Sequence, residues 1–129
     1  MKPIHIYIET YKRAVIICSG SYKKFIKTVR KTYGKANAKE IERLYHYKPS
    51  YAGRTYFAVD GLGIVIHLEK PPRTPTAIAV MVHELSHATN EILRNAGMPL
   101  TEDSEEAYTY LLEHLTREAL KATQPHFAK

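Results

Sequence analysis

The hydrophobic positions near the N-terminus follow the two-residue period of β-strands. Apolar and polar residues alternate over 4–9, and 14–18 is a continuous apolar run rich in β-branched side chains. Alternation is typical of a half-buried strand, and a short apolar run is typical of a buried one. Residues 10–13 predict a turn between them. We therefore expect two successive strands at the start of the chain.

The spacing then changes to that of a helix. Ser21 is a suitable N-cap for a helix over roughly 22–33, and Gly34 is a suitable stop. A second short helix is expected over 37–47, ended by Pro49. The apolar residues that share one face of the first helix are Phe25, Ile26, Val29 and Tyr33.

A β-hairpin is predicted next. Residues 54–59 and 63–69 flank the pair Asp60-Gly61, and Asp-Gly between apolar strands is a strong hairpin signal. Two long helices follow. The first is expected over about 75–96, with Thr74 as its cap, and the second starts at 103 or 104 and ends near 122.

These elements predict an α+β fold: a small antiparallel or mixed sheet followed by two long helices. A chain of 129 residues with 44% hydrophobic composition suits one domain with its own core, so we expect a single domain over 1–129. The single cysteine, Cys18, excludes an intrachain disulfide, and its place in an apolar run predicts a small buried side chain.

No apolar stretch approaches the roughly 20 residues of a membrane span. The N-terminus has neither the apolar segment nor the cleavage site of a secretory signal. We therefore expect a cytoplasmic protein that does not bind membranes.

Charge is distributed unevenly. Residues 1–56 hold 13 Lys/Arg against 3 Asp/Glu, whereas residues 57–129 hold 6 against 10. The basic half is either a face that meets nucleic acid or an acidic partner, or the solvated side of an amphipathic helix. Apolar residues between the lysines favour the solvated side. Since no nucleic-acid-binding motif is present, a nucleic-acid partner is not expected.

Candidate chemistry is concentrated in His83-Glu84-Leu85-Ser86-His87, inside the predicted helix over 75–96. Histidines four residues apart project from one helix face and can share a metal ion. Zinc accepts such imidazole nitrogens and lowers the pKa of a bound water to about 7. Glu84 lies about 100° round the helix from His83, where it can flank that water and take its proton. The pattern predicts a zinc hydrolase with Glu84 as its general base.

The motif, followed by a glutamate on a later helix, resembles the gluzincin branch of the zincins. More narrowly, the chain is similar to small metallopeptidases encoded by phages and prophages. The resemblance covers most of residues 53–115 and implies a zinc peptidase acting on peptides or proteins. The shared segments are Gly53-Arg54-Thr55-Tyr56, Gly63-Ile64-Val65-Ile66, Val82-His83-Glu84 and Glu106-Ala107-Tyr108-Thr109-Tyr110-Leu111.

In gluzincins the later glutamate is the third zinc ligand. Glu105 and Glu106 are the candidates here, because the other acids after His87 fall in the connecting loop or too far along either helix. Glu105 lies nearer the apolar face of its helix. Glu106 can also form a capping box with Asp103. The resemblance favours Glu106, which follows His87 with eighteen residues between them. The Asp that gluzincins carry four residues after this glutamate is missing, so no carboxylate is assigned to orient the histidines.

Three further side chains and one strand are candidates for a role at the metal site. His67 either approaches the metal or lies on the surface of its strand. Tyr108 and Tyr110 either stabilise an oxyanion or pack in the core. In zincins the strand before the metal helix is commonly the edge on which substrate lies, so the resemblance assigns that role to 63–68.

The alternative from another class is a phage structural or assembly protein that keeps a zincin fold with a non-catalytic metal site. The shortness of the chain favours it, since little remains for a second lobe around a cleft. A structural zinc site, however, takes four protein ligands, and no cysteine lies near the histidines.

Overall fold

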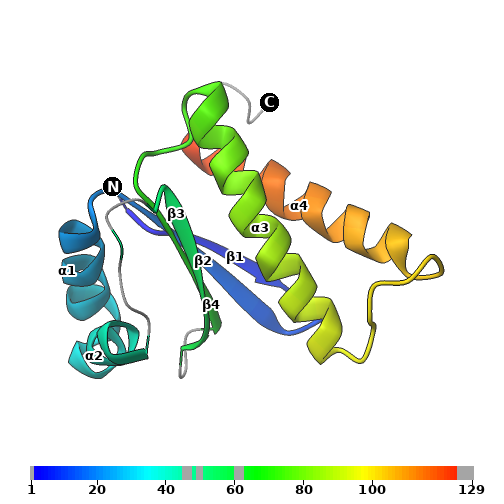
Figure 1. Ribbon diagram of the computed structural model, residues 1–129, viewed down its shortest axis with the longest axis horizontal. Helices are drawn as coiled ribbons and strands as arrows, with labels where there is room; N and C mark the ends of the chain where they lie inside the picture. The colour runs from blue at the N-terminus through cyan, green and yellow to red at the C-terminus, as the bar shows by residue number, and fades with distance from the viewer. Residues whose placement is uncertain (1, 45–47, 49–50, 60–62, 125–129) are drawn as a thin grey trace.

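The computed structural model describes residues 2–44, 48, 51–59 and 63–124. Figure 1 shows a four-stranded sheet between two pairs of helices. The strands are β1 (Ile4–Ile8), β2 (Arg13–Ser19), β3 (Gly53–Val59) and β4 (Gly63–Leu68). The helices are α1 (Tyr22–Tyr33), α2 (Lys35–Leu44), α3 (Pro75–Asn95) and α4 (Glu105–Thr123). The predicted α+β class is confirmed.

The sheet is mixed, with the strand order β1-β2-β4-β3. β1 is antiparallel to β2, β2 is parallel to β4, and β4 is antiparallel to β3. The assignment of 63–68 to the sheet edge is therefore wrong. β4 has a hydrogen-bonded neighbour on each side, and β3 is the edge strand beside α3.

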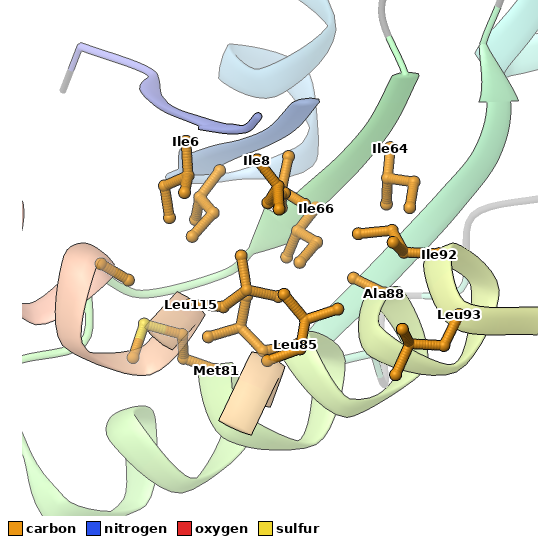
Figure 2. Close-up of a cluster of buried hydrophobic side chains, with 14 of the residues drawn as sticks. Ile6, Ile8, Ile64, Ile66, Met81, Leu85, Ala88, Ile92, Leu93 and Leu115 are labelled. Atoms are coloured by element: carbon orange, nitrogen blue, oxygen red, sulfur yellow. The ribbon is translucent and has the colours of Figure 1, made fainter. Parts of the chain in front are cut away.

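The two faces of the sheet carry separate cores. On one face α1 and α2 cover Val65 of β4, and on the other α3 and α4 cover Ile64 and Ile66. Side chains of successive strand residues point to opposite faces, so a run of apolar residues in β4 serves both cores. Figure 2 shows the second of these cores, where sheet isoleucines meet Leu85 and Ala88 of α3.

The predicted helix ends are largely confirmed. The Ser21 side chain accepts a hydrogen bond from Lys24 N, and the Thr74 side chain accepts one from Ala77 N. α2 begins at 35, two residues before its expected start, directly after Gly34. The expected end of α2 at 45–49 lies mostly outside the described residues, as does the Asp60-Gly61 turn, but the antiparallel pairing of β3 with β4 is observed.

Cys18 is buried in the core under α1, as its apolar surroundings predicted. Burial raises the pKa of the thiol to about 12, which keeps it in the neutral form. None of the helices in the described part of the chain combines the length and apolar composition that crossing a membrane requires.

Candidate metal centre

α3 presents the motif residues in two different directions. The helix buries Leu85 and Ala88 against the sheet, which leaves His83 and His87 on an exposed flank. The side chain of His83 is 67% exposed, whereas that of the neighbouring Glu84 is only 8% exposed. The step of about 100° between consecutive helix positions separates them. The histidines therefore face solvent while the carboxylate is held inside.

The two imidazoles are set at the spacing of metal ligands. His83 Nε2 and His87 Nε2 lie 3.3 Å apart, and the ring centroids are 4.9 Å apart in an edge-on arrangement. Two nitrogens that bind one tetrahedral zinc at about 2.0–2.1 Å must themselves be about 3.3–3.4 Å apart. The histidine pair fits two of the protein positions of a zinc site.

The two carboxylate oxygens of Glu84 have different neighbours. Its Oε1 accepts a 2.7 Å hydrogen bond from the hydroxyl of Thr55, on β3. Its Oε2 lies 3.9 Å from His83 Nε2. The same hydroxyl is also 3.2 Å from the Glu84 carbonyl oxygen. A buried carboxylate needs hydrogen-bond partners, and Thr55 supplies one that fixes which oxygen is turned toward the imidazoles.

Gly53 allows β3 to lie this close to α3. A β-carbon at that position would be 2.9 Å from Val80 Cγ1 and 3.1 Å from Glu84 Cγ. The first contact is shorter than β-carbons tolerate and the second is unusually tight, so a larger residue would require Val80 and Glu84 to move. The absence of a β-carbon at Gly53 therefore allows β3 and α3, the two walls of the site, to approach closely.

A cleft of about 330 Å³ opens over these residues, between the start of β3 and α3. It is open to solvent rather than enclosed. Its lining residues are Tyr51, Gly53, Arg54, Thr55, Phe57, His83, Glu84 and His87. A second hollow of about 390 Å³ continues from His87 and Phe57 toward Tyr108 and the loop after α3. The surface beside the histidines is thus an extended trough.

The expected third ligand is not brought to the histidines. Glu105 and Glu106 are exposed in the first turn of α4, and neither lines the cleft. Across the described residues, no group of three His, Cys, Asp or Glu side chains is placed to hold a metal ion. The N-cap of α4 is Ser104, so the alternative role of Glu106 in a capping box with Asp103 is wrong. The assignment of Glu106 as a ligand stays a prediction.

His67 occupies neither of its two expected places. It is buried on the α1 side of the sheet, where it stacks on Phe25 with ring centroids 4.6 Å apart. Its Nε2 lies 2.6 Å from the Gly20 carbonyl oxygen, to which it donates. The alternation of side chains along β4 turns His67 away from α3. Burial lowers the pKa of His67 below its ordinary value, and the Gly20 hydrogen bond and the Glu69 carboxylate oppose that shift only in part.

Tyr108 lines the second hollow, whereas Tyr110 lines neither of the two hollows beside the histidines. The ring of Tyr108 is buried, and its hydroxyl donates a 2.7 Å hydrogen bond to the Met98 carbonyl. Tyr110 is 65% exposed and belongs to neither the core nor the cleft lining. A core role is therefore confirmed for Tyr108, whereas the core role expected for Tyr110 is wrong and its role toward an oxyanion stays a prediction.

The sequence pattern predicts no role for Thr55, Gly53 or Phe57. All three belong to β3, the strand that forms the second wall of the cleft. The available signal was a glycine and a hydroxyl residue at alternate positions of a strand in which Arg54, Tyr56 and Phe57 are large. A scan of the chain against models of known protein families gave no match, and neither did comparisons with curated proteins and with solved structures.

Proposed function

We propose that the chain is a zinc-dependent hydrolase that cleaves peptide bonds, with His83 and His87 as metal ligands and Glu84 as general base. The observation that carries the proposal is the 3.3 Å separation of the two Nε2 atoms, with the Glu84 carboxylate beside them. The cleft next to these groups gives a substrate access to both.

When bound, zinc lowers the pKa of a water to about 7 and polarises a peptide carbonyl. Glu84 takes one proton from the attacking water as the water oxygen bonds to the carbonyl carbon. It then passes that proton to the amine nitrogen as the C–N bond breaks, so that one water is added across the peptide bond. Thr55 holds Oε1, which leaves Oε2 as the oxygen that moves the proton.

The proposed substrate is an extended peptide segment. β3 is an edge strand, and an edge strand can pair with an added chain through its backbone groups. The cleft lining places the ring of Phe57 near His87, where it offers an apolar contact for a substrate side chain. These features support cleavage of an extended chain laid along β3 in place of the strand first expected.

Glu106 is kept as the third protein ligand on the resemblance to gluzincins, with Glu105 as the alternative. A catalytic zinc site takes three protein ligands plus water, and two are supplied by α3. Among the described residues no third side chain of this kind stands with the two histidines, so ligation by either glutamate needs a change in its side chain or in the first turn of α4.

A phage structural or assembly protein with a non-catalytic metal site is the second candidate. Two observations favour this second candidate. The cleft is open to solvent, and among the described residues the histidines have no third ligand beside them. Glu84 distinguishes the two proposals, because a metal site without catalysis has no use for a buried carboxylate that does not bind the metal.

The test combines metal analysis with a peptidase assay on a library of peptides. We expect about one zinc per chain in the wild type, less than a tenth of it in His83→Ala and His87→Ala, and unchanged zinc in Glu84→Gln. Hydrolysis should be lost in all three variants. Zinc retained by either histidine variant contradicts the metal site, and equal activity of wild type and Glu84→Gln contradicts the mechanism.

A further inference from the structure

The outer surface of α1 and α2, which we name the α1–α2 face, concentrates positive charge. Its only acidic residues, Glu40 and Glu42, each form an ion pair with an arginine of the same face. Arg43 lies 3.2 Å from Glu40, and Arg30 lies 3.4 Å from Glu42. The exposed cations of the face are Lys23, Lys24, Lys27, Arg30, Lys31, Lys35, Lys39 and Arg43.

The fold fixes these cations in one orientation. Phe25, Ile26 and Val29 anchor α1 to the sheet, so the positions between them point outward. A groove of about 440 Å³ runs along this face, with Lys23, Lys27 and Arg30 in its lining. Tyr22, Ile26 and Glu42 complete the lining. The charge therefore borders a surface depression rather than a uniformly convex helix.

The α1–α2 face is separate from the candidate metal centre. Figure 1 shows α1 and α2 on one side of the sheet and α3 on the other. A ligand of the basic face has the whole sheet between it and the histidines. The α1–α2 face and the candidate metal centre therefore lie on opposite sides of the sheet.

We propose that the α1–α2 face binds the phosphodiester backbone of nucleic acid. A row of cations on two helices complements a polymer with one negative charge at every repeat, and lysine and arginine both bind phosphate. Net charge concentrated in this way attracts polyanions over distances of about a Debye length, roughly 10 Å at 0.1 M salt.

A folded acidic protein is a poorer match for the same surface. Lysine is depleted from the centres of protein–protein interfaces, which rely on buried aromatic and aliphatic anchors. The large hydrophobic side chains that stand exposed among the described residues are Tyr7, Leu100 and Tyr110, and none of them belongs to α1 or α2. The observations therefore favour backbone contacts to nucleic acid over docking of a protein.

Under this proposal the basic half of the chain is more than the solvated helix surface expected from the sequence. The spacing of lysines along one helix does not show whether they join the basic residues of another helix on a common surface. The structure adds the packing of α1 against α2 and the ion pairs of both carboxylates with arginines, neither of which can be read from the spacing.

The experiment measures binding of the full chain, without added metal, to fluorescein-labelled duplex DNA and duplex RNA by fluorescence anisotropy at several salt concentrations. The test variant is Lys23→Gln/Lys27→Gln/Lys31→Gln. The control variant, Arg94→Gln/Arg117→Gln/Lys121→Gln, removes the same charge from exposed positions of α3 and α4. Circular dichroism checks that each variant is folded.

We expect the wild type and the control to bind alike within about twofold. We expect the test variant to bind at least ~10-fold more weakly at low salt. The slope of log K against log salt concentration should be smaller in magnitude by roughly 2–3, because each lost phosphate contact removes about 0.9 from it. Binding of DNA, RNA or both supports the proposal and identifies the source of the backbone. Absence of salt-dependent binding, equal weakening in both variants, or equally tight binding of poly-glutamate overturns it. Since zinc is not needed, these results are independent of the hydrolase assay.

Discussion

The hydroxyl of Thr55 donates a 2.7 Å hydrogen bond to Oε1 of Glu84, across the interface between the edge strand and the motif helix. Both residues are buried, so the bond is shielded from water. It links the proposed general base to β3, a part of the chain in which sequence reasoning placed no site residue.

Replacing Thr55 with valine tests this link, because valine keeps the shape and removes the hydroxyl. We expect hydrolysis with kcat about 10- to 100-fold lower and KM changed less than about threefold, since substrate binding does not need this bond. Zinc content should stay the same. The free energy of unfolding should fall by about 1–3 kcal/mol, since a buried carboxylate loses a partner.

Thr55→Ser is the matched control. It restores the hydroxyl while leaving out one methyl group, so kcat should return to within a few-fold of the wild-type value. If serine and valine are equally impaired, the effect of Thr55 is one of packing and its positioning role is incorrect.

Gly53→Ala is expected to impair both stability and activity. The added β-carbon would meet Val80 Cγ1 at 2.9 Å and Glu84 Cγ at 3.1 Å, and overpacking of this kind costs about 1–3 kcal/mol. Urea unfolding and peptidase rates measure the two effects. Because Val80→Ala removes the nearest obstructing atom, the double variant should be more stable than Gly53→Ala alone. No rescue by Val80→Ala would show that the close contact with Val80 is not the cause.

The identity of the third ligand is tested by comparing zinc affinity in two neighbouring variants. Glu106→Ala should weaken binding at least ~10-fold, as expected for loss of one of three protein ligands, whereas Glu105→Ala should change it less than about threefold. Competition with a fluorescent zinc chelator gives both values. The reverse order assigns the ligand to Glu105, and unchanged affinity in both variants removes α4 from the metal site.

The lowered pKa of His67 predicts how the free energy of unfolding depends on pH. Its pKa is lowered in the folded state, so the unfolded chain takes up a proton more readily as the pH falls through its ordinary value of about 6.5. Stability from this group is complete above that pH and declines below it. Urea midpoints at pH 7, 6 and 5 should therefore fall more steeply in the wild type than in His67→Phe. Parallel pH profiles would mean that His67 does not titrate on unfolding.

The sequence was most informative where local rules act alone. Ser21, Gly34 and Thr74 mark helix ends through backbone chemistry within a few residues, and all three stand at the ends observed. The i, i+4 spacing of the histidines is equally local, which explains why their shared flank of α3 was predictable.

Strand order and burial depend on distant segments, and there the predictions failed. Nothing near β4 in the chain reveals that β2 pairs with it, so the edge role went to the wrong strand. His67 looked like a polar surface residue because its partners, Phe25 and the Gly20 carbonyl, lie more than forty residues away. Thr55 was overlooked for the same reason: its partner is 29 positions further on.

The parallel pairing of β2 with β4 has a consequence for how the chain folds. The strand pairs β1–β2 and β3–β4 join segments that are neighbours in the chain. Val15 of β2 pairs with Ile64 of β4 across a connection that contains α1, α2 and β3. Closing so long a loop is entropically costly and slows folding. β3, β4 and α3 are consecutive, so the walls of the cleft belong to one local unit of the chain. We expect mutations in that hairpin and helix to alter unfolding rates, and mutations along the β2–β4 seam to slow the rate-limiting step of folding.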